Sequence, residues 1–447
     1  MVARLVIAAP ASGSGKTTVA TGLMAALRAR GRRVAPFKVG PDYIDPGYHS
    51  LAAGRPGRNL DPNLVGEHRV APLFRHGAAG ADIAVIEGVM GLFDGRIETG
   101  FGSTAHVAGL LDAPVLLVVD ARGQSSSIAA LLHGFRSFRP GVRLAGVVLN
   151  QVGSDRHEEV LRAACAEVGL PVLGAVRRAG AVAVPSRHLG LVPAAEHGAD
   201  AVGAVAAMAD LVASSVDLDA VVEMAATAPA LPGDAWDAAA EVARGPAAVI
   251  AVAGGPAFTF GYAEHVELLA AAGAEVAVVD PVRDEKLPPD TAGLVLPGGF
   301  PEQHADALSA NAPLRAAVAD AVRAGLPVHA ECGGLLYLAS TLDGNPMCGA
   351  LPVDAEMTPR LTLGYRDAVA TVDSCLHPAG ARVTGHEFHR TRTRPQHGDP
   401  PAWAWRDATG AAVREGFASA SVHASYLHTH PAGHPEAVAR FLAAARG

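Results

Sequence analysis

The chain of 447 residues is poor in aromatic side chains and cysteine, and it lacks long uninterrupted apolar runs. Aromatic residues make up only 5% of it, although 50% of the residues are hydrophobic, so a sizeable core must be mainly aliphatic. The spacing of the four cysteines fits neither a disulfide framework nor a zinc site, and scattered thiols suit a reducing compartment. These cysteines are Cys165, Cys332, Cys348 and Cys375. No apolar stretch reaches the ~18 residues of a membrane span without a break. We therefore expect a cytoplasmic protein without membrane segments.

Blocks of like charge are also missing from the chain. The formal net charge is −8, and Lys and Arg do not cluster along the sequence. Nucleic-acid binding would need a clustered basic face, and an acidic surface disfavours anionic membranes. The apolar run near the N-terminus is better explained as a strand than as a secretory leader. We expect neither nucleic acid nor membrane as a partner.

Short apolar runs recur along the first half of the chain, with helical stretches between them. They cover residues 5–9, 83–86, 115–119 and 145–149, and Gly, Asp or Asn stands directly or shortly after most of them. Runs that are apolar throughout are typical of parallel strands covered on both faces. The pattern predicts a doubly wound α/β domain, with functional residues at the carboxyl ends of its strands.

A second α/β series begins at residues 247–253 and continues through residues 274–280, 293–297 and 326–331. The pattern thins before it, where an Ala-rich stretch is broken by Pro229, Pro232 and Gly233. We predict two tandem α/β domains, at residues 1–225 and 247–447, joined by a linker at residues 226–246.

Residues 5–18 read LVIAAPASGSGKTT, which is a strand, a small-residue loop and the start of a helix. In a phosphate loop, backbone N–H groups cradle phosphates, the lysine reaches the β and γ phosphates, and the following hydroxyl binds Mg²⁺. Pro10 stands where the usual pattern opens with glycine. The predicted ATP-binding residues are Gly13, Ser14, Gly15, Lys16, Thr17 and Thr18. Asn150 follows a predicted strand. Its side-chain amide is predicted to read an adenine edge, and the alternative is an ordinary loop asparagine.

Two acidic segments are predicted to complete the nucleotide site. Glu87 ends an apolar strand in VIEGVMGLFDG (residues 85–95), and FKVGPDYIDPGYH (residues 37–49) carries two aspartates. Carboxylates beside a phosphate loop suit Mg²⁺, so Thr17, Asp45 and Glu87 are the predicted metal ligands. A lysine there neutralises charge on a moving phosphoryl group. The residues predicted for substrate binding and phosphoryl transfer are Lys38, Asp42, Tyr43 and Asp94. Turn formation is the alternative for the aspartates.

The second predicted site is a thiol nucleophile in AECGGLLYL (residues 330–338). A strand, Cys332 and an apolar helix match the nucleophile elbow, and we expect the helix N-terminus to lower the pKa of the thiol. Gly333 and a glycine of LPGGFPE (residues 296–302), Gly298 or Gly299, are predicted oxyanion donors, with Gly299 preferred. His428 or His430, in ASYLHTH (residues 424–430), supplies the base.

With both sites in view, the whole chain resembles the cobyrinate and hydrogenobyrinate a,c-diamide synthases, which amidate a corrin precursor. Further motifs that carry the resemblance are PSRHLGLVPAAE (residues 185–196) and GHEFHR (residues 385–390), and Pro10 belongs to the family pattern. The resemblance implies a P-loop domain similar to dethiobiotin synthetase and a class I glutaminase domain. It makes Cys332 the nucleophile and His428 its base.

The resemblance also implies the reaction. Mg²⁺ and ATP activate the a- and c-acetate carboxylates as acyl phosphates, and glutamine supplies ammonia, without a redox cofactor. We expect hydrogenobyrinate or cobyrinate as substrate and a homodimer as the assembly. His386, Glu387 and His389 line the macrocycle or are packed core. His430 stands where class I glutaminases carry glutamate, so a dyad is expected to replace the triad.

Several alternatives stay open at this point. Enzymes of the cobyric acid synthase type, and those that amidate a nickel tetrapyrrole, share the chemistry. A non-enzymatic alternative is a partitioning-type ATPase that switches by dimerising, which would not need Cys332 as a nucleophile. A glutaminase that has lost its activity and uses free ammonia is also consistent with the absent glutamate.

Overall fold

The structure is a computed structural model that describes residues 2–447 except residues 98, 179–185, 188–189 and 192–193. The chain divides into two compact units, Met1–Trp236 (unit 1) and Asp237–Gly447 (unit 2). The division falls within the stretch predicted as a linker, residues 226–246. Of the motif at residues 185–196, five positions lie outside the described residues.

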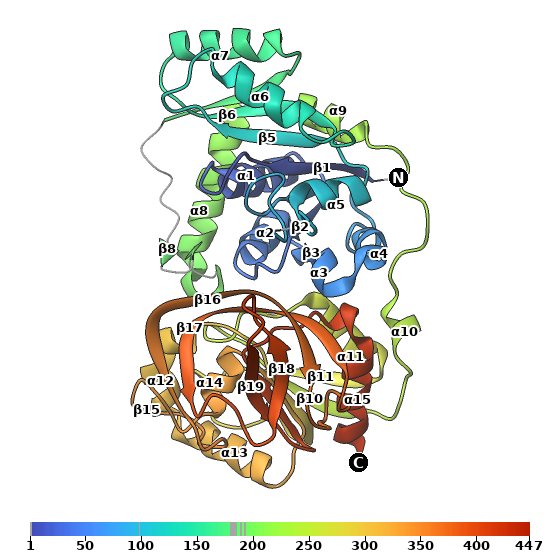
Figure 1. Ribbon diagram of the computed structural model, residues 1–447, viewed down its shortest axis with the longest axis vertical. Coiled ribbons are helices and arrows are strands. Elements are labelled where there is room, and N and C mark those ends of the chain that lie inside the picture. The colour runs from blue at the N-terminus through green and yellow to red at the C-terminus, as the bar shows by residue number, and fades with distance from the viewer. Residues whose placement is uncertain (1, 98, 179–185, 188–189, 192–193) are drawn as a thin grey trace. The chain divides into compact units, whose positions relative to one another are not determined.

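Unit 1 contains a seven-stranded sheet in the order β3-β2-β4-β1-β5-β6-β7, with every neighbouring pair parallel. From β1 the chain moves to one edge through β2 and β3, and later to the other edge through β5, β6 and β7. These connections run in opposite directions from β1, and helices lie on both faces of the sheet (Figure 1). This is the predicted doubly wound domain. The reversal of strand order at β1 creates a site at the carboxyl ends of the central strands.

Four of the seven strands in the unit 1 sheet cover the predicted apolar runs, and β2, β3 and β7 had no counterpart among them. The strands are β1 (Ala3–Ala8), β2 (Val34–Val39), β3 (Arg58–Leu60), β4 (Ile83–Glu87), β5 (Val115–Asp120), β6 (Leu144–Val152) and β7 (Val172–Arg177), with a separate pair β8 (Ser186–Arg187) and β9 (Gly190–Leu191). The helices are α1 (Lys16–Ala29), α2 (Asp45–Ala53), α3 (Pro62–Val65), α4 (Glu67–Gly77), α5 (Thr104–Leu110), α6 (Ile128–Ser137), α7 (Asp155–Glu167), α8 (Ala194–Ser215) and α9 (Leu218–Ala226).

Unit 2 combines a parallel and an antiparallel sheet region. The parallel strands run in the order β11-β10-β12-β13-β20. From β20 the sheet continues through antiparallel β19, β18 and β16, and β17 pairs along most of β16. The parallel region is the predicted second α/β series, whereas the antiparallel extension had no counterpart in the sequence analysis.

The elements of unit 2 have the following bounds. The strands are β10 (Ala248–Ala253), β11 (Ala274–Val279), β12 (Thr291–Leu296), β13 (Val328–Glu331), β14 (Thr341–Leu342), β15 (Asn345–Pro346), β16 (Asp354–Ala370), β17 (Arg382–Arg394), β18 (Pro401–Arg406), β19 (Ala412–Ala418) and β20 (Val422–Ser425). The helices are α10 (Ala238–Glu241), α11 (Ala263–Ala271), α12 (Ala305–Ala310), α13 (Ala312–Arg323), α14 (Gly333–Leu338) and α15 (Pro435–Arg446), with 3-10 turns η1 (Pro301–His304) and η2 (Pro431–Gly433).

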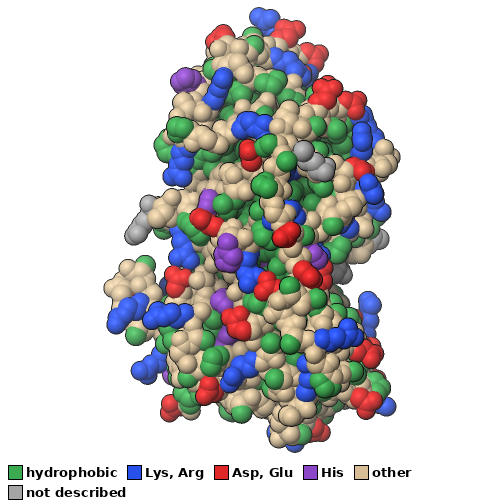
Figure 2. Space-filling view, turned by 90° about the vertical axis from the view of Figure 1, so that its right-hand side faces the viewer, with side chains coloured by type: hydrophobic (Ala, Val, Ile, Leu, Met, Phe, Trp, Pro, Cys, Tyr) green, Lys and Arg blue, Asp and Glu red, His purple; other side chains and the backbone are tan. Residues whose placement is uncertain are grey.

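The surface and the helices agree with the composition. On the face of the described residues in Figure 2, Lys and Arg side chains are interspersed with Asp and Glu instead of forming one basic stretch. Within the described part of the chain, no helix has the length and apolar character needed to cross a membrane. All four cysteines are buried and free of disulfides.

Candidate active sites

The phosphate loop connects β1 to α1, at the centre of the unit 1 sheet. Gly13 and Gly15 adopt φ angles of 79° and 98°, in the region that favours glycine. A Cβ on Gly15 would stand 2.2 Å from Nδ2 of Asn150. The helix begins at Lys16, so its first N–H groups face the loop, where they are suited to bind phosphate oxygens.

Lys16 is buried, and its ammonium group is held inside the loop. Its Nζ donates to the carbonyl of Met90 at 2.6 Å and to that of Ala11 at 3.4 Å. Burial, together with the nearby Lys38 charge, lowers the pKa of Lys16. An anion placed beside this ammonium would therefore be bound strongly, because it would offset the cost of burying the charge.

A buried group of charged side chains, here called the lysine–carboxylate cluster, lies next to the loop. It consists of Thr17, Lys38, Asp45, His49 and Glu87. Nζ of Lys38 lies 2.6 Å from Oδ2 of Asp45 and 3.0 Å from Oε1 of Glu87. The parallel register of β2 and β4 sets Lys38 directly beside Glu87. Oγ1 of Thr17 donates to Glu87 at 2.7 Å, and Nε2 of His49 lies 2.7 Å from Oε2 of Glu87.

One ammonium group lies between two carboxylates in this cluster. Burial works against the charge on Lys38, yet Asp45 and Glu87 raise the pKa of its ammonium above the usual value. Burial also opposes the charge on Glu87, but Lys38 and His49 hold the pKa of this carboxyl below its usual range. Burial and the charges of Asp42 and Glu87 raise the pKa of Asp45. The ammonium of Lys38 thus keeps Glu87 ionised but does not offset the burial and repulsion that act on Asp45.

The predicted metal ligands do converge. Oγ1 of Thr17 is 2.7 Å from Glu87 and 3.5 Å from Asp45, so one hydroxyl and two carboxyl groups face a common point. Such hard oxygen donors fit Mg²⁺, which uses few protein ligands and completes its shell with phosphate oxygens and water. Among the described residues, no three His, Cys, Asp or Glu side chains could hold a metal alone. A cation placed here would offset the repulsion by Asp42 and Glu87 that contributes to the raised pKa of Asp45.

Other predicted residues of this site are engaged in local turns. Oδ1 of Asp42 accepts from the N–H groups of Ile44 and Asp45, and Oδ2 of Asp94 accepts from that of Gly91. These contacts match the turn-forming alternative. Asn150 donates from Nδ2 to the carbonyl of Ser14 at 2.9 Å, and its Oδ1 accepts from its neighbour's N–H. The amide braces the phosphate loop, which favours the loop alternative over adenine reading.

Two further predicted residues of this site, Tyr43 and Thr18, lie near the phosphate loop or the cluster in the sequence. Tyr43 is half-buried in the loop that precedes α2, and Thr18 is half-buried in the first turn of α1. His49 in the cluster was quoted within a motif but given no role by the sequence analysis. The available signal was its place four residues after Asp45, about one turn along α2, which puts both side chains on the same face of the helix.

In unit 2, Cys332 follows β13 directly and precedes α14. Its φ of 46° is unusual for a residue with a side chain, as the sharp turn of a nucleophile elbow requires. Its N–H donates to the carbonyl of Ser425, the last residue of the neighbouring parallel strand β20. His428 comes three residues after that strand, so Cys332 and His428 meet at the same sheet edge.

Three glycines pack against the elbow. A Cβ on Gly298 would stand 2.4 Å from Cε1 of His428, and one on Gly333 would stand 2.9 Å from the amide nitrogen of Gly299. A Cβ on Gly299 would overlap the carbonyl of Ala257. The predicted oxyanion donors Gly299 and Gly333 are therefore adjacent, as two N–H groups aimed at one oxygen must be.

The expectation that the helix N-terminus lowers the pKa of the thiol is wrong. Burial and the carboxylate of Glu302 raise the pKa of Cys332, and they outweigh the N–H of Gly333, which acts in the opposite sense. The six-residue helix α14 is too short to reverse the cost of burial. A thiol of this kind needs a base to remove its proton.

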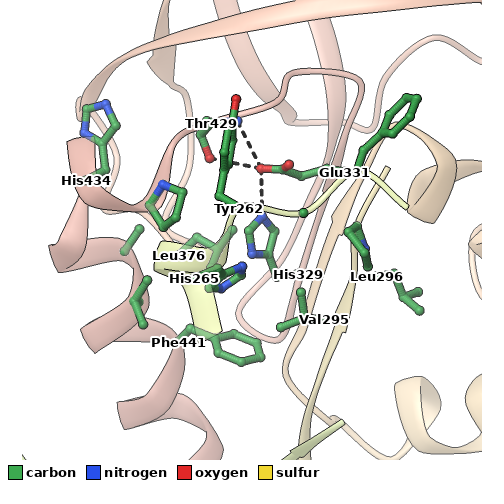
Figure 3. Close-up of a pocket in the computed structure, with 16 residues that line it drawn as sticks. Tyr262, His265, Val295, Leu296, His329, Glu331, Leu376, Thr429, His434 and Phe441 are labelled. Atoms are coloured by element: carbon green, nitrogen blue, oxygen red, sulfur yellow. Dashed lines mark hydrogen bonds and ion pairs between the residues drawn. The ribbon is translucent and has the colours of Figure 1, made fainter. Parts of the chain in front are cut away.

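The reason given for a dyad, that no carboxylate faces the histidine, is wrong. Oε2 of Glu331 lies 3.3 Å from Nδ1 of His428. Its other oxygen, Oε1, accepts from N–H and Oγ1 of Thr429, and it lies 3.2 Å from Nε2 of His329 (Figure 3). The sequence signal was present, since Glu331 immediately precedes the predicted nucleophile Cys332, but the expected position was two residues after His428.

His430 occupies that expected position and is engaged elsewhere. Its Nδ1 accepts from the N–H of Ala432 at 3.2 Å, and its ring lies 4.1 Å from that of Tyr262. It therefore caps the turn η2, and the structure does not offer it as the base.

The residues predicted to line the macrocycle, or else to form packed core, lie buried on β17 of unit 2. The backbone of His386 pairs with that of His428 through two hydrogen bonds of 2.9 Å. Oε2 of Glu387 accepts from Nε of Arg366 at 2.6 Å, and the ring of His389 stacks on Tyr426 at 3.8 Å. These contacts match the packed-core alternative.

Comparisons with known families divide the chain as the structure does. Residues 5–192 match the CobQ/CobB/MinD/ParA nucleotide binding domain. Residues 249–435 match the CobB/CobQ-like glutamine amidotransferase domain. The first match contains the phosphate loop and the lysine–carboxylate cluster, and the second contains Cys332, Glu331 and His428.

Similar curated proteins match over nearly the full length. Hydrogenobyrinate a,c-diamide synthase of Mycobacterium tuberculosis (strain ATCC 25618 / H37Rv) is 60% identical, covering 99% of this chain and 98% of the relative. The protein of that name in Streptomyces coelicolor is 58% identical, covering 99% and 97%. Cobyrinate a,c-diamide synthase of Gloeobacter violaceus is 44% identical, covering 98% and 96%.

Proposed function

Since the chain belongs to the family of hydrogenobyrinate and cobyrinate a,c-diamide synthases, glutamine-dependent amidating ligases, we propose that it acts on metal-free hydrogenobyrinate. The relatives of 54–60% identity are named for that ring, whereas those named for cobyrinate are 40–44% identical. The observation that carries the proposed amidation with ATP and glutamine is the pairing in one chain of a phosphate loop with a thiol nucleophile elbow. The product is the a,c-diamide.

We propose that unit 1 activates the carboxylates with ATP. A carboxylate oxygen of the substrate attacks the γ phosphorus, ADP leaves, and an acyl phosphate forms. Lys16 and the N–H groups of the phosphate loop neutralise the phosphate oxygens, and Lys38 stabilises charge on the transferring group. Thr17, Asp45 and Glu87 would hold Mg²⁺, which would neutralise charge on the phosphates.

We propose that unit 2 supplies the nitrogen. The sulfur of Cys332 attacks the side-chain amide carbon of glutamine while His428 takes the thiol proton. The N–H groups of Gly299 and Gly333 stabilise the oxyanion. His428 then returns the proton to the leaving ammonia, and water hydrolyses the thioester to glutamate. Ammonia attacks the acyl phosphate carbon, inorganic phosphate leaves, and an amide remains.

The proposal is tested by product mass. The enzyme is incubated with Mg²⁺, ATP, glutamine and either hydrogenobyrinate or cobyrinate, and each product is weighed by mass spectrometry. Two added amides, formed faster on the metal-free ring, are expected. Amides on other side chains of the ring would instead favour the cobyric acid synthase type, and activity only on a nickel tetrapyrrole would favour the enzyme of that substrate.

The assembly and location belong to the same proposal. A homodimer in the cytoplasm is expected, and light scattering coupled to size-exclusion chromatography measures the dimer. A monomer at micromolar concentration would contradict that part alone.

A further inference from the structure

The carboxylate of Glu331 occupies a position that the sequence analysis left empty. Glu331 is the last residue of β13, and the sheet pairs it with Ser425 at the end of β20. The chain after β20 returns His428 to the same edge, where Nδ1 of the ring lies 3.3 Å from Oε2 of Glu331. The predicted nucleophile and the carboxylate are therefore consecutive in the chain, with Glu331 at the end of β13 and Cys332 directly after it.

The second oxygen of this carboxylate is anchored. Oε1 accepts from the N–H of Thr429 at 3.1 Å and from its hydroxyl at 3.0 Å. Nε2 of His329 lies 3.2 Å from the same oxygen (Figure 3). These contacts fix the carboxylate plane, so that Oε2 keeps facing the imidazole of His428.

The charge on Glu331 is preserved despite burial. Burial would raise the pKa of this carboxyl, but the contacts with His329 and His428 hold it well below its usual range. Across from an imidazole Nδ1, a carboxylate holds the proton on that nitrogen and leaves Nε2 free to act as a base. It also stabilises the imidazolium that forms when the thiol proton is taken.

We propose that Glu331 is the positioning carboxylate of the glutaminase site, in the role that the residue after Thr429 has in ordinary class I glutaminases. It selects the tautomer of His428 and stabilises its charged form during attack by Cys332. This inference rests on the proposed roles of Cys332 and His428. The raised pKa of the thiol makes such support for the base necessary, because little thiolate is present beforehand.

The test compares Glu331→Gln with Glu415→Gln in the full-length protein. Glu415 is another buried carboxyl beside β20, and it accepts from Oγ of Ser425 and the N–H of Tyr426 without facing His428. Both substitutions keep the shape of the side chain. Glutamate release from glutamine is measured under steady-state conditions, and amidation supported by ammonium chloride is measured on the same preparations.

For Glu331→Gln, kcat for glutamine is expected to fall between about 10²- and 10⁴-fold, with KM nearly unchanged. Ammonia-supported amidation should be unchanged, and alkylation of Cys332 by the glutamine analogue diazo-oxo-norleucine should slow in parallel with kcat. Glu331→Asp, which keeps the charge, should recover part of the rate. Glu415→Gln should keep the wild-type kcat.

Three outcomes would overturn the proposal. One is a wild-type kcat in Glu331→Gln, and another is an equal loss in Glu415→Gln, which would indicate a structural role. The third is a large loss in His430→Asn with none in Glu331→Gln. The proposed function fails separately if Cys332→Ser still releases glutamate. If Cys332→Ser loses glutamate release while Glu331→Gln keeps the wild-type kcat, this inference is contradicted and the proposed function is not.

Discussion

At the scale of single residues, the two sites solve opposite electrostatic problems. Cys332 is buried among apolar side chains and carboxylates, which raise the pKa of its thiol, so a base has to generate the nucleophile. Lys38 is buried between two carboxylates, which raise the pKa of its ammonium, so its positive charge persists. A reactive sulfur and a permanent cation are what thioester formation and phosphoryl transfer respectively need.

Cys332→Ser replaces the thiol with a hydroxyl of similar size. We expect glutamine-dependent activity to fall by at least about 10³-fold, because a hydroxyl is a far weaker nucleophile in this setting. Amidation supported by ammonium chloride should stay near the wild-type rate. Parallel assays with the two nitrogen sources measure this, and loss of both activities would contradict separate sites for ammonia release and amidation.

Lys38→Met removes the ammonium from the lysine–carboxylate cluster. We expect kcat for amidation to fall by about 10²-fold or more, because one charge that stabilises the transferring phosphoryl group is lost. Glutamate release in unit 2 should remain. ADP formation and glutamate formation are measured side by side.

The control is Arg33→Met, which removes an exposed cation paired with Asp82 at 2.7 Å. Exposed pairs contribute about 0–1 kcal/mol, so this variant should behave like the wild type. Equal losses in both variants would show that Lys38 acts through stability instead of phosphoryl transfer.

At the scale of elements, the loop after β12 sets the space available to His428. Gly298 has ordinary φ, yet a Cβ there would stand 2.4 Å from Cε1 of the imidazole and 3.2 Å from the ring of Phe260. The loop and the chain after β20 thus fit together only without a side chain at this position.

Gly298→Ala should displace His428 and lower kcat for glutamine by about 10²-fold, as misplacement of a catalytic group by about 1 Å does. Gly261→Ala is the matched control, since a Cβ at Gly261 meets nothing within 4 Å. Steady-state glutaminase kinetics and the melting temperature of both variants measure the effect. Equal rates in the two variants would show that the loop gives way to the added methyl group.

Strand β19 carries a buried acid that makes stability depend on pH. Burial raises the pKa of Glu415 from its usual 4.5 to about 8, although Ser425 and Tyr426 donate to it. Because the folded state holds this proton longer than the unfolded state, the wild type loses stability as pH rises from about 4.5 to about 8. The limiting slope is about 1.4 kcal/mol per pH unit.

Glu415→Gln removes that dependence. Its free energy of unfolding, measured by urea denaturation, should rise relative to the wild type between pH 5 and pH 8 and stay constant above that. A difference between the two proteins that does not change with pH would show that the carboxyl is ionised in the folded protein.

The more apolar strands of the parallel regions could be predicted from their runs of hydrophobic residues, as β4, β5 and β10 illustrate, whereas β2, which carries Lys38, and the three-residue β3 could not. The antiparallel extension could not. The long strands β16 and β17 mix charged, small and apolar residues, and their burial pattern is irregular. Their pairing depends on contacts between distant residues, which composition along the chain does not encode.

The candidate site residues divide in the same way. Gly15, Lys16 and Cys332 stand in local strand–loop–helix patterns whose chemistry is set by neighbours in sequence. Glu331 was missed because its partner, His428, is brought to it by the pairing of β13 with β20. Motif spacing fixes local geometry, but the approach of two strand ends is a property of the folded sheet.

At the scale of the whole molecule, the chain joins two compact units with separate chemistry. Unit 1 holds the phosphate loop, and unit 2 holds the nucleophile elbow, and each corresponds to its own family match. Full-length similarity to a,c-diamide synthases shows that the two are kept together in this family. The account therefore requires nitrogen released in unit 2 to reach the carboxylate activated in unit 1.

The most direct test follows that nitrogen. Wild-type protein is given hydrogenobyrinate, Mg²⁺, ATP and glutamine labelled with heavy nitrogen in its side-chain amide, with no added ammonium salt. The account predicts a product carrying two labelled amides, with one ADP formed for each amide. Unlabelled amides, or ADP release indifferent to the ring, would contradict it.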